Sequence, residues 1–240
     1  GCMVEGVEHV CDKEKFDELM KSDMVEDKGS MQHMAMTAHA GTRNSVDVHM
    51  FQVSFIRPDA RPGKEALLKF IINDIQSKKP TSDLEIVHDK IMHVVLVRND
   101  LRHFDHVHPE MVEPGVFAVP YEFLASGLYR IWIDFTIDGM QHIVDFDINV
   151  PGSFEAEEKD MLNGIKVNFK KPKEIIAEKE IDLKFEIFDE NNKPIPITEK
   201  FLAADAHLIS IDGSLEEFEH NHDEKFDKDK TLKSIVSDRN

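Results

Sequence analysis

Three histidines at fixed spacing are the residues of this sequence best suited to chemistry. His93, His106 and His108 follow the pattern H-x12-H-x-H. In an extended segment His106 and His108 point to the same side, and a chain that folds back beside His93 brings three imidazoles together. Neutral imidazole is a common ligand of copper, zinc and nickel. The pattern therefore predicts a transition-metal site, with His88 near enough in sequence to add a fourth ligand or an outer contact.

The same constellation recurs 114 positions further along the chain, where His207, His220 and His222 repeat the spacing H-x12-H-x-H. Other residues recur at offsets of 114 or 115: Val53, Phe55 and Pro58 at Val167, Phe169 and Pro172, and Leu68-Lys69-Phe70 at Leu183-Lys184-Phe185. Duplication of one module is the economical explanation, and it predicts a second metal site. The second copy departs from the first at Asp223, which stands in place of Pro109.

A further set of candidate ligands lies near the N-terminus, in a small and polar segment without helix or strand periodicity. Its members alternate thioethers with imidazoles: Met31, His33, Met34, Met36 and His39. Thioether sulfur is a soft ligand that favours Cu(I), and a flexible segment of this kind can wrap such an ion. The alternative is a methionine-bearing linker with no chemistry.

Composition and missing motifs restrict the function. Lys and Arg total 29 against 47 Asp and Glu, a net charge of −18, so nucleic acid is not an expected partner. The chain has no G-x-S-x-G, P-loop, G-x-G-x-x-G or H-E-x-x-H motif. No cysteine follows Cys11, which excludes the thiolate of a blue-copper site. We therefore expect a protein without catalytic activity. One enzyme alternative remains, because His106, His108 and Glu113 have the H-x-H-x4-E spacing of cupin metalloenzymes.

Short apolar runs separated by turn residues dominate the chain from Phe51 onward. In the segment 129–135 the residues alternate, with tyrosine, isoleucine and phenylalanine on one side and arginine, tryptophan and aspartate on the other. Seven such runs occur within about 100 residues, a density typical of immunoglobulin-like folds. They are 51–56, 66–72, 92–97, 104–108, 116–120, 128–136 and 141–149. We predict an all-β protein of two tandem immunoglobulin-like β-sandwich modules.

The predicted organisation has four parts. Residues 1–45 contain a short amphipathic helix over 12–27 and the Met/His linker, and residues 46–150 form the first module. A linker over 151–162 leads to the second module, 163–240. The second module lacks counterparts of the last two predicted strands of the first. Truncation, completion by a partner chain in an oligomer, and rearrangement all remain open.

The two cysteines, Cys2 and Cys11, lie together near the start of the chain. They allow three interpretations: a small disulfide in an oxidising compartment, two spectator thiols, or a lipidated Cys2 of a bacterial lipoprotein. The sequence has no stretch of about 18 apolar residues, so we predict no membrane-spanning helix.

The segment MHVVLVRNDLRHFDHVHPE (92–110), together with SGLYRIWIDF (126–135), resembles a family of exported bacterial proteins of immunoglobulin-like fold. That family has the signature M-H-x-x-x-V-x-x-D-L-x-x-F-x-H-x-H-P, is often duplicated, and is described as related to copper or heavy metals. The resemblance covers both repeats, roughly residues 50–225. It implicates the histidines already singled out by their spacing.

The resemblance implies an exported protein of the periplasm or outer cell envelope, held there by a lipid if Cys2 carries one. We expect it to sequester copper or hand it to a metal-transfer partner, with Cu(II) at the histidine sites and Cu(I) at the Met/His linker. Zinc is the alternative metal. The competing hypothesis is a structural or interaction β-sandwich that binds no metal.

Overall fold

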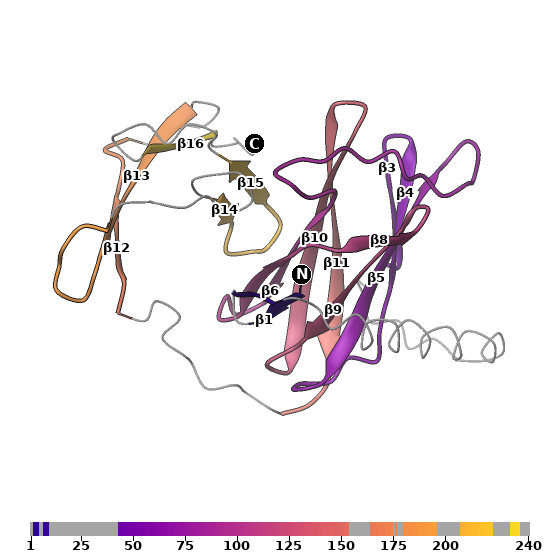
Figure 1. Ribbon diagram of the computed structural model, residues 1–240, viewed down its shortest axis with the longest axis horizontal. Coiled ribbons are helices and arrows are strands. Elements are labelled where there is room, and N and C mark those ends of the chain that lie inside the picture. The colour runs from indigo at the N-terminus through magenta and orange to yellow at the C-terminus, as the bar shows by residue number, and fades with distance from the viewer. Residues whose placement is uncertain are drawn as a thin grey trace. The chain divides into compact units, whose positions relative to one another are not determined.

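The computed structural model describes residues 2–4, 7–9, 43–153, 164–174, 176, 180–195, 207–222 and 231–235 (Figure 1). The chain divides into two compact units, Gly1–Glu157 and Glu158–Asn240, with a boundary inside the predicted linker 151–162. Within these described ranges every regular element is a β-strand, so the protein is all-β. The helix predicted over 12–27 lies outside them. The described part of the chain also holds no helix of the length and apolar character that crossing a membrane requires.

Unit 1 is a β-sandwich of two antiparallel sheets. One sheet has the strand order β3-β4-β5-β9-β8 and the other β11-β10-β6-β7, while β1 (Cys2–Val4) and β2 (Val7–His9) form a separate hairpin. The strands of the first sheet are β3 (Ser45–Val48), β4 (Phe51–Ile56), β5 (Glu65–Asp74), β8 (Glu110–Glu113) and β9 (Val116–Glu122). Those of the second are β6 (His93–Arg98), β7 (Phe104–Val107), β10 (Gly127–Ile137) and β11 (Met140–Val150). All seven predicted runs are strands.

The core of unit 1 lies between the two sheets and follows from alternation along the strands. In β10, Tyr129, Ile131, Ile133 and Phe135 are all buried in one apolar cluster, as their period of two predicts. The opposite sheet contributes Phe55, among others, whose ring stacks on Phe70 at 5.2 Å and contacts Phe146 at 5.7 Å between centroids. Each such buried side chain stabilises the fold by about 1.5–3 kcal/mol.

The strand order is that of an immunoglobulin-like fold. β4, β5, β9 and β8 correspond to strands A, B, E and D, and β6, β10 and β11 to strands C, F and G, with β7 added beside C. Tyr129, near the start of β10, donates a hydrogen bond from its hydroxyl to the carbonyl oxygen of Ala125 at 2.9 Å. This is the tyrosine corner found at the start of strand F in such domains. The immunoglobulin-like prediction is therefore confirmed.

Unit 2 contains two smaller antiparallel sheets among its described residues, with strand orders β12-β13-β16 and β14-β15. The strands are β12 (Lys166–Lys170), β13 (Glu180–Phe188), β14 (His207–Ile211), β15 (Phe218–His222) and β16 (Thr231–Ile235). Its pairings follow those of unit 1. β12 and β13 pair Phe169 with Phe185, and β4 and β5 pair Phe55 with Phe70. Both pairs are stacked, with centroids 5.0 Å and 5.2 Å apart.

Candidate metal centre

The hairpin formed by β6 and β7 positions the three histidines of the first motif, which we call the triad (His93, His106 and His108). Its register pairs Val94 with Val107 and Val95 with His106. Val94 and Val107 point into the sandwich core. Side chains alternate along a strand, so the residues that precede these two valines point the other way. His93 and His106 therefore project from the face of the sheet that is turned away from the core.

The closed end of this hairpin is fixed by an ion pair. The buried guanidinium of Arg98 donates to the carboxylate of Asp100, with Nε and Oδ1 2.8 Å apart, and also to the carbonyl oxygen of Ser126 at 3.3 Å. The hydrogen bonds from Arg98 hold the pKa of Asp100 at about 2, below its usual 3.8. Asp100 Oδ1 also accepts a hydrogen bond from the backbone N–H of Arg102 at 3.1 Å. The turn that sets the register of β7 against β6 is thus held from both sides.

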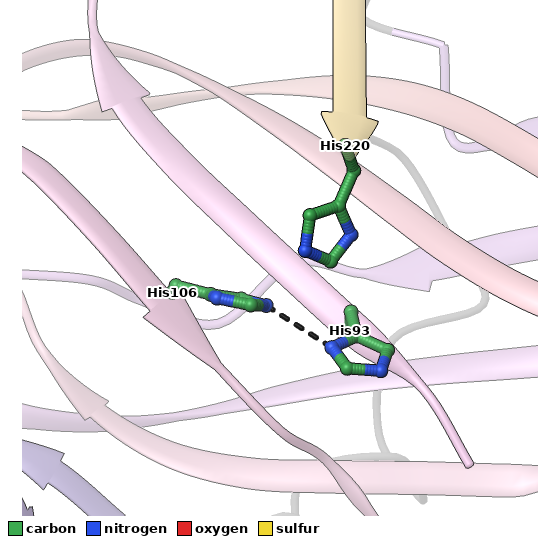
Figure 2. Close-up of side chains that lie close together, drawn as sticks. All are labelled: His93, His106 and His220. Carbon is green, nitrogen blue, oxygen red and sulfur yellow. Dashed lines mark hydrogen bonds between the residues drawn. The ribbon is translucent and has the colours of Figure 1, made fainter. Parts of the chain in front are cut away.

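A chain of hydrogen bonds orients two imidazoles of the triad. His93 Nε2 lies 3.0 Å from the carbonyl oxygen of Val87, and His93 Nδ1 lies 3.1 Å from His106 Nε2 (Figure 2). A carbonyl oxygen only accepts, so His93 Nε2 carries the proton and donates it. His93 Nδ1 then has a lone pair that is aimed at His106. This fixes the tautomer of His93 with its unprotonated nitrogen directed at His106.

His108 completes the group. Its ring centroid is 4.9 Å from that of His93 and 4.6 Å from that of His106. The ring centroids of His93 and His106 are 5.3 Å apart. All three side chains are buried. Three imidazoles within contact of one another on one hairpin are the arrangement that the spacing predicts.

Two of the three imidazoles, those of His93 and His106, have facing nitrogens at the separation of two ligands on one metal ion. Metal–nitrogen bonds of about 2.0–2.1 Å at angles between square-planar and tetrahedral place two neighbouring ligand atoms about 2.9–3.4 Å apart. The 3.1 Å between His93 Nδ1 and His106 Nε2 is within that range. A metal-ligating histidine usually donates its other N–H to a carbonyl or carboxylate, as His93 does to Val87. The same atoms also form a metal-free hydrogen bond, so both chemical uses are open to this geometry.

His88 lies in a tight turn closed by backbone hydrogen bonds between Val87 and Lys90. Its φ is +49° and its side chain is half-buried. The carbonyl of the preceding residue, Val87, is the group that contacts His93, and the sequence pattern gave no indication of it. Ligation by His88 itself stays a prediction.

The hairpin of β14 and β15 carries the histidines of the second motif. Its register pairs His207 with His222 and Ile209 with His220. The second of these pairs corresponds, 114 positions later, to the pair of Val95 and His106 in the first hairpin. His220 is buried, with its ring centroid 6.2 Å from that of Phe218. The side chains of His207 and His222 are outside the described part, so ligation there stays a prediction.

The N-terminal candidates, Met31, His33, Met34, Met36 and His39, lie outside the described residues. Their Cu(I) site also stays a prediction.

The cupin alternative is wrong. It requires Glu113 to face the same ion as His106 and His108. Glu113 is exposed and belongs to β8, in the five-stranded sheet, whereas the triad lies on the hairpin of β6 and β7 in the other sheet. The linear spacing imitates a cupin motif only because a short strand of the other sheet follows the hairpin directly.

A second histidine contact was not predicted from the sequence. His49 Nδ1 and His142 Nδ1 lie 3.2 Å apart, although 93 positions separate them. Neither residue belongs to a spaced motif, so only the pairing of the strands brings them together.

Residues 44–152 match the model of a family described as a domain of unknown function (DUF8832). The matched span runs from the residue before β3 to just beyond the end of β11, so it coincides with the sandwich of unit 1. A comparison with curated proteins gave no match.

Among solved structures, a copper-bound variant of FetP from uropathogenic Escherichia coli is 13% identical, with a TM-score of 0.35 over 47% of this chain and 96% of FetP. Escherichia coli alpha-2-macroglobulin activated by porcine elastase is 16% identical, with a TM-score of 0.27 over 58% of this chain and 11% of that one. Salmonella alpha-2-macroglobulin reacted with methylamine is 14% identical, with a TM-score of 0.27 over 83% and 13%. The chain spans only a small part of both macroglobulins.

Proposed function

We propose that this chain is an exported, non-catalytic protein that binds a transition metal, with copper as the preferred ion. It would sequester this metal or hand it over in the cell envelope. The triad provides the ligands. The observation that carries the proposal is the pair of ring nitrogens 3.1 Å apart on His93 and His106, with the tautomer of His93 set by Val87. A ligating atom is thereby presented before any ion arrives.

The choice of copper rests on the ligand chemistry and on the sequence signature. A site of imidazole nitrogens binds Cu(II) more tightly than the other divalent ions of the first transition row. Zinc is the alternative metal. The net charge of −18 attracts cations toward the protein. Export, and the handover to a partner, rest on the resemblance of residues 92–110 to the exported family.

The proposal extends to a duplicated module with a second, equivalent hairpin. Support comes from strand pairing: Ile209 pairs with His220 as Val95 pairs with His106, and each of these residues is displaced by 114 positions. A repeat that kept both the histidines and their register is expected to keep their use.

A second candidate function follows from the same hydrogen bonds. In a purely structural sandwich, the contacts from Val87 to His93 and from His93 to His106 would serve only to hold the open end of the hairpin. This hypothesis predicts that the protein retains no metal and that a chelator leaves its melting temperature unchanged.

A pair of substitutions at one position separates the two functions. A glutamine side-chain amide can donate the hydrogen bond that His106 gives to His93, but an amide is a poor transition-metal ligand. His106→Gln therefore keeps the structural contact and removes the ligand, whereas His106→Ala removes both. The untagged wild type and both variants are equilibrated with limiting copper and zinc, freed of loose metal, and analysed for metal per chain.

We expect the wild type to retain copper and both variants to lose at least one ion per chain. The metal-free melting temperature is expected to fall in His106→Ala more than in His106→Gln. Retention of the same copper by wild type and by the His93→Ala, His106→Ala, His108→Ala triple variant would refute a metal site at the triad. Absence of metal in all of them would favour the structural function.

A further inference from the structure

Two histidines outside the triad meet at one edge of the unit 1 sandwich, and we call them the edge pair (His49 and His142). His49 lies in the two-residue turn between β3 and β4, with φ of +52°, and His142 is the third residue of β11. β3 and β11 are edge strands of different sheets. The contact of 3.2 Å between the two Nδ1 atoms therefore bridges the two sheets.

The edge pair is separate from the triad. His142 pairs with Phe135 across β10 and β11, and Phe135 is in the core, so His142 faces inward. His93 pairs with Asp134, the neighbour of Phe135, and so faces outward. The two groups of imidazoles lie on opposite faces of the four-stranded sheet.

Aromatic packing fixes the ring of His142. It stacks on Phe135 at 5.2 Å with an interplanar angle of 22°, and meets Phe51 edge-on at 5.4 Å. Its side chain is buried, whereas His49 is exposed. Burial, with a smaller contribution from His49, lowers the pKa of His142.

The distance and the surroundings of the edge pair both suit an ion. Two nitrogens 3.2 Å apart have the separation expected of neighbouring ligands on one metal, about 2.9–3.4 Å. Without a metal, one proton must lie between them, and an ion would replace it. Two exposed methionines lie close to the pair in sequence: Met50 follows His49 in the turn, and Met140 precedes His142 by two residues in β11.

We propose that His49 and His142 form a second transition-metal site, which takes copper through both Nδ1 atoms and leaves one side of the ion open to solvent. The site does not depend on the triad. Imidazole nitrogen is a common copper ligand, and the open side allows an ion to enter and leave. Because the ligands come from β11 and from the turn beside β3, a bound ion fastens one edge of the sandwich.

The experiment uses the full chain with the triad and also His207, His220 and His222 replaced by alanine, so that neither histidine motif can bind. Copper(II) alone is added, and the dissociation constant, the copper retained per chain and the electron paramagnetic resonance spectrum are measured. The unfolding midpoint is followed with and without copper through the fluorescence of Trp132, the only tryptophan. Loss of copper between wild type and this background tests the two histidine motifs separately from the edge pair.

Two variants in that background test the edge pair. His49→Asn keeps a residue that tolerates positive φ and an amide that can donate to His142 Nδ1, but removes one imidazole. His142→Phe keeps an aromatic ring beside Phe135 and Phe51 and removes the other ligand. The metal-free midpoint of each variant shows whether it folds.

We expect the background protein to retain one copper with coupling to two nitrogens, and its unfolding midpoint to rise with copper. Each variant is expected to weaken copper binding at least about ten-fold, which corresponds to ~1.4 kcal/mol, and to lose the rise in midpoint. If copper binding is unchanged in both variants, the copper lies elsewhere, for example at the N-terminal Met/His segment, and the proposal is overturned. A background protein that retains no copper would overturn it as well.

Discussion

Replacing Asp100 by asparagine is expected to destabilise unit 1 in a way that depends on pH. The side chain of its partner, Arg98, is only 4% exposed, whereas that of Asp100 is 37% exposed. Asparagine keeps an oxygen acceptor for the N–H of Arg102 but has no charge to pair with the buried guanidinium. Asp100→Asn thus isolates the contribution of the ion pair from that of the turn.

The magnitude follows from the pKa of Asp100, which is lowered from 3.8 to about 2. This difference of about 1.8 units corresponds to ~2.4 kcal/mol at 1.36 kcal/mol per unit. Because more than a third of the carboxylate side chain is exposed, solvent screening reduces the figure, and we expect about 1–1.5 kcal/mol at neutral pH. In a module of about 100 residues this lowers the melting temperature by roughly 4–8 °C.

The pH dependence has a definite sign. The folded state holds the pKa of Asp100 below its unfolded value, so the unfolded chain binds more protons between about pH 2 and pH 3.8. The stabilisation is complete above that window and is lost as the pH falls through it. The difference between wild type and Asp100→Asn is therefore largest at neutral pH and about half as large near pH 3.

Urea unfolding followed by Trp132 fluorescence measures this effect in unit 1, because the only tryptophan lies in β10. Asp59→Asn is the matched control. Asp59 and Arg61 form an ion pair at the same sequence spacing, but their side chains are 78% and 51% exposed, so its loss should cost a few tenths of a kcal/mol. An Asp100→Asn effect no larger than that of the control, or equal at pH 7 and pH 3, would refute the reasoning.

Other substitutions in unit 1 have expected costs that the same urea titration checks. Tyr129→Phe should cost about 1–2 kcal/mol, because it leaves the carbonyl of Ala125 without the hydroxyl that contacts it at 2.9 Å. Gly115→Ala, at φ +72°, would place a Cβ 2.6 Å from a proline carbon and should cost about 3 kcal/mol or more. Gly63→Ala has nearly the same φ with nothing within 4 Å, and should cost only about 1 kcal/mol. Phe55→Ala should cost about 3–5 kcal/mol, because the ring is fully buried.

The fold was largely predictable because its central strands have strong patterns. The segment 129–135 alternates apolar and polar residues and is the middle of β10, which pairs with a strand on each side. β3 and β8 were missed because they are short edge strands of mostly exposed residues, SVDV and EMVE. Edge strands bury little apolar surface, so their sequences have little alternation to detect.

The triad was predictable because one local hairpin brings its residues together, and a spacing of this kind is visible in the sequence. The carbonyl of Val87, which sets the tautomer of His93, was not, since any residue supplies a backbone oxygen. The edge pair was also not predictable. His49 and His142 meet only because the core aligns two strands from different sheets, a long-range effect that spacing does not encode.

The alternation along β6 and β7 places the core and the triad on opposite faces of one hairpin. Val94 and Val107 fix the register from the inside, and a slip by one residue would turn the imidazoles of His93 and His106 into the apolar core. Selection on the core therefore preserves the geometry of the outward positions whatever residues occupy them. Exchange of an imidazole there for a thioether or a carboxylate would change the ligand chemistry of the hairpin while the sandwich stayed the same.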